Sequence, residues 1–325
     1  MKRREFIGLL GGTAAAWPLA AQAQPAAMPV IGFLHSGSPE QNVKRVASLR
    51  KGLSTAGFVE GKNVAIEFRW ASGQNDRLPE LTADLIRRQV ALIATLSSTP
   101  AAVAAKAATN TIPIVFLIAD PPVELGLVAS FNRPGGNATG FITLNVELAA
   151  KRLGLLREVA PKATTVAALL NPGHPSFKPV SDLLKATAGP LGVQLQILQA
   201  STDGEIEAAY LALKPGGALL VATDPFFFTR RAQIVALSAR HAVPAVYDSL
   251  DYANAGGLIS YGTDIENLWE QAGVTIGRIL KGEKPADLPV AQPTKFVLAI
   301  NVKTAKTLGL EIPSKLLFTA DEVIE

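Results

Sequence analysis

The sequence predicts an α/β protein of two similar lobes, each a parallel sheet flanked by helices, and two observations support this. First, a short apolar run that ends in a polar residue and a proline occurs five times along the chain. Second, both halves show the arrangement, since "NTIPIVFLIAD" in the first half corresponds to "HAVPAVYDSLD" in the second. Short, continuously apolar runs are typical of strands buried on both faces, and their alternation with helices indicates parallel β–α units.

Five strand–helix units follow in order. The predicted strands lie in "VIGFLHSGSP", "ALIATLSSTP", "IPIVFLIADP", "TVAALLNP" and "GALLVATDP". The segments after them are predicted to be helices: "EQNVKRVASLRKGLSTAG", "AAVAAKAATN", "VELGLVAS", "SFKPVSDLLKATAG" and "FFFTRRAQIVALSARH". Pro close behind Ser, Thr, Asp or Asn favours the start of a helix, because its missing N–H would have no partner there.

Two turn-rich stretches predict the connections between the lobes. "NRPGGNATGFITLN" lies between the two halves, and "AGGLISYGTD" is the expected return crossing. We therefore expect lobe 1 to hold residues 29–142 and 257–285, and lobe 2 to hold residues 143–256 and 286–325. The sequence thus predicts two similar α/β lobes joined by multiple crossover strands.

The first 23 residues indicate an export signal peptide. They combine a basic start containing an Arg-Arg pair, a short apolar stretch and a small-x-small end at Ala23. The order resembles a twin-arginine signal, and an ordinary secretory signal is the alternative route. An N-terminal membrane anchor is the other interpretation, but three glycines and a proline interrupt the short apolar stretch, which favours cleavage near Ala23.

Composition excludes several classes of protein. Of the 325 residues 48% are hydrophobic, which is enough for two cores and argues against disorder. Leaving out the four charged residues that follow Met1, the chain has 28 basic and 26 acidic side chains. It therefore lacks the excess of positive charge that is typical of nucleic-acid-binding proteins. The absence of cysteine excludes disulfides, a thiol nucleophile and thiolate metal sites.

Catalytic and metal-binding motifs are missing. The chain contains no G-x-S-x-G elbow, no phosphate-binding loop and no H-E-x-x-H pair, and its three histidines lie far apart. His35 and Ser36 could meet Asp120 as a hydrolytic set, and His35, Asp120 and Asp224 could meet as a metal site, but neither set stands in a recognisable context. We predict no catalytic residues, no metal and no cofactor.

The strand ends supply the candidate binding residues, because ligands of open parallel sheets sit beyond the carboxyl ends of the strands. "TLSSTP" predicts Thr99 as the N-cap and Pro100 as the first helical residue, which leaves the N–H groups of Ala101 to Val103 unpaired. Together with the hydroxyls of residues 97–99 they favour a carboxylate or another anion. Ordinary capping, in which Thr99 bonds only its own helix, is the alternative.

Two acids and three aromatic residues complete the set. Asp120 and Asp224 each follow a strand and precede Pro, so they either accept a ligand's ammonium or stabilise a helix start. Phe226, Tyr247 and Tyr261 fall at strand ends or crossovers, where a flat ligand would stack on them. The neighbouring aromatic residues of the "FFF" run are expected in the core.

Longer motifs carry a resemblance to a known family. They are "FNRPGGNATGF", "DPFFFTRRAQIVALSARHAVPAVYD", "AGGLISYG", "GRILKGEKPADLPVAQPTKFVLAINVKTAKTLGLEIP" and "ADEVIE". The chain resembles the bacterial ABC-transporter substrate-binding proteins of the tryptophan/tyrosine-binding-like group. The resemblance implies a type I periplasmic-binding fold with two Rossmann-like lobes and three crossings. It also implies that the 97–99 junction is a carboxylate-binding helix start and that the "LIAD" turn is a second binding loop.

The resulting hypothesis is a monomeric periplasmic receptor that captures a small carboxylate in an inter-lobe cleft and delivers it to a membrane permease and its ATPase. From lobe 1 we expect binding by Ser36, Ser98, Thr99 and Asp120. From lobe 2 and the crossovers we expect Asn171, Asp224, Phe226, Tyr247 and Tyr261. An exported α/β hydrolase and a ligand sensor for a membrane kinase are the alternatives.

Overall fold

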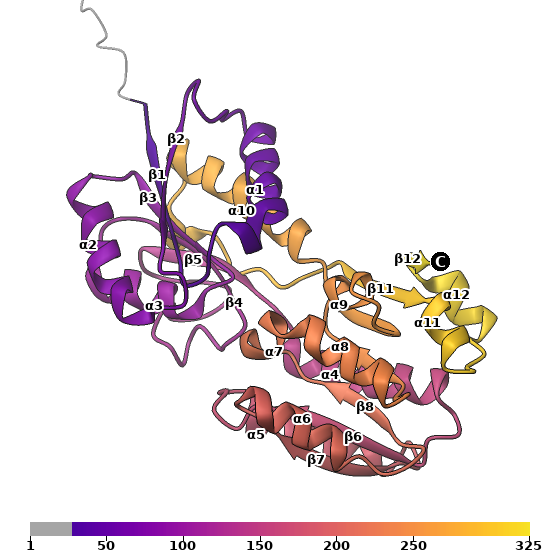
Figure 1. Ribbon diagram of the computed structural model, residues 1–325. Coiled ribbons are helices and arrows are strands. Elements are labelled where there is room, and N and C mark those ends of the chain that lie inside the picture. The colour runs from indigo at the N-terminus through magenta and orange to yellow at the C-terminus, as the bar shows by residue number, and fades with distance from the viewer. Residues whose placement is uncertain (1–27) are drawn as a thin grey trace, which may run out of the picture.

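The computed structural model describes residues 28–325, and two α/β lobes make up this part of the chain (Figure 1). The expected export signal at residues 1–23 lies outside the described residues. The first lobe contains a five-stranded parallel sheet in the order β2-β1-β3-β4-β5. Its strands are β1 (Val30–His35), β2 (Ala65–Trp70), β3 (Leu92–Leu96), β4 (Ile114–Ile118) and β5 (Ala138–Ile142). Every residue of β3, β4 and β5 is buried, as expected for a sheet covered on both faces.

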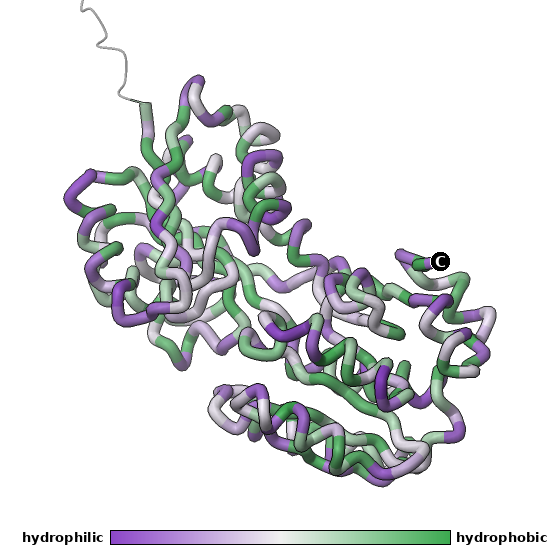
Figure 2. Tube along the Cα trace, viewed as in Figure 1, coloured by the Kyte–Doolittle hydropathy of each residue, from purple (hydrophilic) through white to green (hydrophobic). Residues whose placement is uncertain are grey.

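Two pairs of helices cover the first sheet. One face packs against α1 (Val43–Thr55) and α10 (Ile265–Leu280), and the other packs against α2 (Leu78–Arg87) and α3 (Thr99–Ala108). Short 3-10 turns are η1 (Glu40–Asn42), η2 (Asn75–Arg77) and η3 (Pro285–Asp287). Figure 2 shows hydrophobic residues along the strands between these helix layers. Thus α10, which comes late in the sequence, completes the core of the N-terminal lobe.

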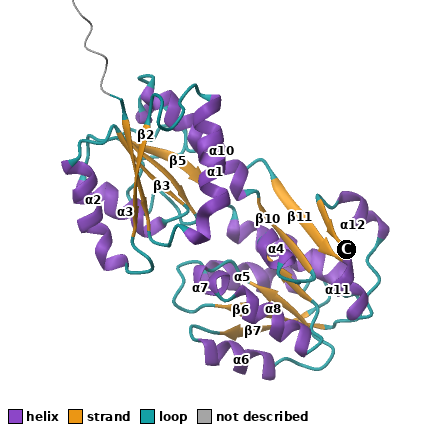
Figure 3. Ribbon diagram, turned by 45° about the horizontal axis from the view of Figure 1, so that its top comes forward, coloured by secondary structure: helices purple, strands orange, loops and turns teal. Residues whose placement is uncertain are grey.

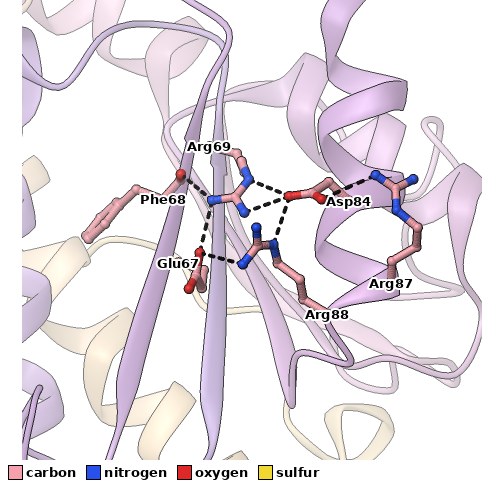
Figure 4. Close-up of polar contacts among 6 residues, drawn as sticks. All are labelled: Glu67, Phe68, Arg69, Asp84, Arg87 and Arg88. Carbon is pink, nitrogen blue, oxygen red and sulfur yellow. Dashed lines mark hydrogen bonds and ion pairs between the residues drawn. The ribbon is translucent and has the colours of Figure 1, made fainter.

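Charged side chains protect the exposed edge of the first sheet (Figure 4). The guanidinium of Arg69 on edge strand β2 donates to Asp84 Oδ2 on α2 through Nε at 2.8 Å and Nη2 at 2.6 Å. Arg69 also pairs with Glu67 at 3.2 Å, and Arg88 approaches both acids. The hydrogen bond from Arg69 lowers the pKa of Asp84. Charges at an edge strand oppose pairing with another chain, so this network is structural.

The second lobe contains a seven-stranded sheet in the order β12-β11-β10-β9-β8-β6-β7. Its strands are β6 (Thr165–Leu170), β7 (Gln194–Gln199), β8 (Ala218–Val221), β9 (Ala245–Tyr247), β10 (Ile259–Thr263), β11 (Phe296–Asn301) and β12 (Glu322–Ile324). The pairing of β10 with β11 is antiparallel and all the other pairings are parallel. This sheet repeats the parallel β–α arrangement of the first lobe and adds a C-terminal extension.

Helices again cover both faces of the second sheet. One face carries α4 (Asn145–Val159), α5 (Phe177–Ala188), α11 (Val302–Thr307) and α12 (Ser314–Thr319). The other carries α6 (Asp203–Leu211), α7 (Pro225–Thr229), α8 (Arg231–Arg240) and α9 (Leu250–Asn254). Of residues 28–325, no helix has both the length and the apolar character needed to cross a membrane.

The chain passes between the lobes three times (Figure 3). It leaves β5 for α4, returns from β10 to α10, and finally leaves η3 to enter β11. Residues 257–285 were expected in lobe 1, but β10 pairs with β9 and so belongs to the second sheet. Conversely, Ala291 forms a bridge with Phe141, so the start of the 286–325 segment still lies on the first lobe. The expected boundary is wrong here because a strand joins its neighbour before the chain crosses.

One expected helix is missing and one begins earlier than expected. The "VELGLVAS" segment after β4 forms turns, since Pro121 and Pro122 precede it and Gly126 adopts φ +67°. Helix α3 is capped by Ser98 and not by Thr99, which is its first residue. The other four strand–helix units form as the pattern predicts.

Close contact between α1 and α10 depends on glycine, and this gives a first prediction. A Cβ atom at Gly52 would lie 1.9 Å from the carbonyl oxygen of Glu270, whereas one at Gly154 on α4 would meet nothing within 4 Å. We expect Gly52→Ala to lower the free energy of unfolding by about 1–3 kcal/mol through overpacking. Gly154→Ala should raise it by up to about 1 kcal/mol. Urea denaturation of both variants checks this, and equal effects of the two substitutions would contradict it.

Candidate functional site

The carboxyl ends of the two sheets face one another. Arg45 on α1, which follows β1, approaches Asp251 on α9 with its Nη2 4.0 Å from Oδ2. The same guanidinium lies 5.3 Å from the ring centroid of Phe228 on α7, which follows β8. The strand ends of one lobe are therefore opposite the strand ends of the other, where α/β sheets bind ligands.

The loops that follow β1, β3 and β4 form one side of the candidate site, the first-lobe wall, and Ser98 joins the first two of these loops. Its hydroxyl donates to Ser36 Oγ at 2.9 Å and accepts the N–H groups of Ser36 at 3.2 Å and Ala101 at 3.4 Å. Only 3% of Ser98 is exposed, so this hydroxyl serves chiefly to join the β1 and β3 loops. The structure brings Ser36 and Ser98 together as expected, but it assigns Ser98 the capping role predicted for Thr99.

The early start of α3 changes which groups remain free for a ligand. The N–H of Ala101 donates to the Ser98 hydroxyl and the N–H of Ala102 donates to the Ser98 carbonyl oxygen, so the unpaired donors expected at Ala101 to Val103 are used by the helix itself. Among the described residues, neither the N–H nor the hydroxyl of half-buried Thr99 makes a hydrogen bond. Thr99 is therefore the available donor at this helix start.

Backbone strain accompanies this junction. Ser97 adopts φ +58°, a left-handed conformation that a non-glycine residue rarely occupies. Its hydroxyl accepts a hydrogen bond of 2.9 Å from the indole Nε1 of Trp269 on α10, which holds the turn in place. Such strained residues gather at functional sites, and this one directly precedes Ser98 and Thr99.

His35 lies at the end of β1 among aromatic rings, a position that the sequence reading did not use for binding. Its Nδ1 accepts the Gly37 N–H at 2.8 Å, which places the proton on Nε2, a buried atom without a partner in residues 28–325. The ring lies 5.1 Å from Trp70 and 6.5 Å from Trp269. Burial, and secondarily the charge of Arg45, lowers the pKa of His35 from 6.5 to about 3. His35 is thus a neutral hydrogen-bond donor. The sequence signal for its position is the i, i+2 spacing from Phe33, which places both rings on the same face of β1.

Asp120 follows β4 on the same wall. It is half-buried, and its Oδ1 is buried with no hydrogen-bond partner in the described chain. A buried carboxylate oxygen without a donor is costly, so an incoming N–H or ammonium group would be favourable there. This geometry favours the acceptor role over the helix-start role, because no helix follows Asp120.

The loops that follow β6, β8 and β9 form the opposite side, the second-lobe wall. Its residues Asp224 and Asn171 accept hydrogen bonds from backbone N–H groups of their own loops. Asp224 caps α7, with Oδ1 accepting the N–H groups of Phe226 at 2.6 Å and Phe227 at 3.2 Å. Asn171 Oδ1 accepts the Gly173 N–H at 3.0 Å in the loop after β6. Both residues lie at strand ends as expected, but the geometry realises the helix-start role for Asp224.

The expected aromatic residues occupy three different surroundings. Phe226 is half-buried under the guanidinium of Arg230, 3.9 Å from its ring centroid. Tyr261 stacks on Phe296 at 6.1 Å, away from the Ser98 junction. Tyr247 was expected at the site but is 0% exposed, stacks on Tyr252 at 4.7 Å and donates its hydroxyl to Ser238. It belongs to the core because the β9 side chains alternate between two buried faces.

A buried arginine, missed from the sequence, lies behind the second-lobe wall. Arg152 on α4 is 1% exposed, and its Nη2 donates to Thr223 Oγ1 at 3.2 Å and to the Asn145 carbonyl oxygen at 3.3 Å. Burial lowers the pKa of Arg152, and Asp248 opposes that shift most. Burial in turn raises the pKa of Asp248, which Arg152 opposes. At the ends of β8 and β9, the charges of the Asp248 carboxylate and the Arg152 guanidinium thus stabilise one another.

A large open pocket lies beside the crossovers and not at the Ser98 junction. Its volume is about 1010 Å³, and Tyr261 is the one predicted site residue that lines it. Other lining residues come from both lobes, including Arg45, Lys151, Asp251, Lys295 and Asp321. This pocket has mixed charge and contains none of the Ser36–Ser98–Thr99 groups, so we place the candidate site at the strand ends.

Within residues 28–325, no serine hydroxyl makes a hydrogen bond with a histidine, and no group of three His, Asp or Glu side chains is placed to hold a metal ion. The arrangement instead combines fixed donors, acceptors and aromatic surfaces on two opposing walls, which suits reversible binding of a small molecule.

Comparisons with known proteins bear on the family and the fold of the chain. A family model described as ABC transporter substrate binding protein matches residues 33–324. The chain is 28% identical over 262 residues to the tyrosine-binding protein of Clostridioides difficile (strain R20291), which covers 80% of this chain and 75% of that protein.

Solved structures share the fold. An ABC domain from Streptococcus pneumonia in complex with L-Trp has a TM-score of 0.80 at 26% identity, over 91% of this chain and 99% of that one. A conserved domain protein from Vibrio cholerae O1 biovar El Tor has a TM-score of 0.81 at 24% identity with the same coverage. The type I periplasmic-binding fold expected from the sequence is confirmed.

The buried histidine gives a second prediction. Because the pKa of His35 is about 3 in the folded chain and 6.5 ordinarily, the unfolded chain binds more protons between these values. Folding stability should therefore fall as pH drops below about 6.5, by up to about 1.4 kcal/mol per pH unit. His35→Asn keeps an acceptor for Gly37 but cannot titrate, so it should lose about 2 kcal/mol less stability between about pH 7 and about pH 5. Urea denaturation measures this, and identical losses in both proteins would contradict it.

Proposed function

Because the chain belongs to the ABC transporter substrate-binding protein family, we propose that it is a periplasmic receptor of an ABC importer that captures a small carboxylate between its lobes. The observation that carries the proposal is the pair of opposing strand-end walls, which Arg45 links through Asp251 and Phe228. A membrane permease and its ATPase would take the captured solute. The receptor would be exported, would act as a monomer and would release its ligand unchanged.

The first-lobe wall supports a carboxylate ligand. The N–H and hydroxyl of Thr99 stand at the start of α3, a ten-residue helix with no acidic side chain in its first turn. A helix N-terminus attracts negative charge through its dipole and its free N–H groups. Nearby, the buried oxygen of Asp120 suits an ammonium or N–H group of the same ligand. A carboxylate and an amine held this way describe an amino acid.

The relatives support an aromatic side chain on that amino acid. One relative is a tyrosine-binding protein and another structure contains L-Trp. In this chain, the exposed parts of Phe226 and of Trp70, which lies beside His35, provide flat surfaces on the two walls. We therefore propose tyrosine, tryptophan and related aromatic acids as the first ligands to examine. Lobe closure on such a ligand would be a hinge motion about the three crossings.

A ligand screen gives the third prediction. The mature protein, beginning near Gln24, should be stabilised by an aromatic amino acid in a thermal-shift screen of amino acids and aromatic acids. A ligand at about a hundred times its dissociation constant adds about 2.7 kcal/mol to the free energy of unfolding. The absence of a shift across the whole screen would argue against this ligand class.

Substitution of Thr99 refines that screen. Thr99→Val removes the hydroxyl while keeping the side-chain shape, and it should weaken binding of the identified ligand by about tenfold to a hundredfold, because a hydrogen bond to a charged group is lost. Thr99→Ser is the matched control, since it keeps the hydroxyl and should bind within about threefold of the wild type. Equal affinities of the Val and Ser variants, measured by calorimetry, would exclude this hydroxyl from the site.

A further inference from the structure

Arg45 forms the one ion pair among the described residues that joins the two lobes. Its Nη2 lies 4.0 Å from Asp251 Oδ2. Every other ion pair of residues 28–325 stays within one lobe. The same holds for cation–π contacts, because only the guanidinium of Arg45 lies over a ring of the opposite lobe, that of Phe228.

The first lobe fixes Arg45 in place. It lies in the first turn of α1, and its Nη1 donates to Asn42 Oδ1 at 3.4 Å. Asn42 is 2% exposed and donates through Nδ2 to the Ser38 carbonyl oxygen at 3.0 Å. The loop after β1 therefore holds the guanidinium through Nη1, and Nη2 of the same group approaches the second lobe.

The opposing charges favour this contact. Burial lowers the pKa of Arg45, and Asp251, Asp248 and Glu266 oppose this shift in that order, while Arg231 adds to it. Two of these three acids, Asp251 and Asp248, belong to the second lobe. Only 21% of the Arg45 side chain is exposed, against 48% for that of Asp251, so solvent screens the arginine less than a typical surface charge.

We propose that Arg45 is a positioning residue that holds the lobes at the separation needed for ligand binding, without contacting the ligand itself. An ion pair between lobes exists only while the lobes stay close, so it stabilises that conformation relative to an open one. A ligand that bridges both walls then binds more tightly, because less of its binding energy is used to bring the lobes together. The effect on affinity rests on the proposed function, whereas the effect on lobe separation does not.

The chain provides a matched control on the same helix. Arg50 also combines an ion pair, with Glu60, and a cation–π contact, with Phe68 at 5.8 Å. Both of its partners belong to the first lobe. Arg50→Ala therefore removes the same kinds of contact from α1 as Arg45→Ala but leaves the link between the lobes intact.

The fifth prediction concerns the distance between the lobes in the ligand-free protein. The chain has no cysteine, so Lys62→Cys in the first lobe and Leu211→Cys in the second, both exposed, accept a specific pair of spin labels. Arg45→Ala should shift the label distances toward longer values, and salt raised from about 50 mM to about 500 mM should do the same to the unsubstituted chain. Arg50→Ala should leave the distances unchanged. Unchanged distances in Arg45→Ala would overturn the proposal.

Two further measurements are the affinity of the Arg45 variant for a ligand and the effect of exchanging the charges of Arg45 and Asp251. With tyrosine or tryptophan as the probe, Arg45→Ala should weaken binding by about twofold to tenfold. Arg45→Asp combined with Asp251→Arg exchanges the two charges. This double variant should recover the original label distances and at least half of the affinity that Arg45→Ala loses. Weaker binding with unchanged distances and no recovery would mean that Arg45 contacts the ligand. If neither probe binds the unsubstituted protein, the proposed ligand class is wrong, while the distance measurement still decides the role of Arg45.

Discussion

The parallel direction of the five strands of the first sheet, and of β6 to β10 in the second, is the constraint on which the site depends. Parallel strands bring all their carboxyl ends to one edge, and the loops that leave this edge carry polar residues before the next helix. In this chain the edges of two such sheets face each other, as the approach of Arg45 to Asp251 and Phe228 requires. Three chain crossings join the two lobes between these edges.

Most polar groups at these edges serve the loops and not a ligand. The hydroxyl of Ser98 and the carboxylate of Asp224 are both occupied by N–H groups of their own helix starts. Other groups near these edges have no hydrogen-bond partner within residues 28–325. They include the N–H and hydroxyl of Thr99, the Oδ1 of Asp120, the Nε2 of His35, and the Nε and Nη1 of Arg152. A site with few unpaired groups on a fixed scaffold discriminates ligands by the partners that those groups demand.

The sequence predicted the fold well, because buried parallel strands and helix starts have local signatures, whereas the binding residues at the strand ends stay a prediction. It predicted the cap of α3 one residue late, since the left-handed turn at Ser97 has no residue-type signal. It placed Tyr247 at the site because strand ends look alike in sequence, although alternation directs this ring into the core. Arg152 and the Arg45–Asp251 pair were beyond prediction, because both depend on segments that meet only in the folded chain.

The most direct test of the account is a crystal structure of the mature protein grown with tyrosine or tryptophan. The account predicts a ligand between the strand-end walls, with its carboxylate within hydrogen-bonding distance of Thr99 and its amine facing Asp120. A ligand found instead in the pocket beside Tyr261 and the crossovers would contradict it. So would a ligand-bound structure in which the two strand edges do not both contact the ligand.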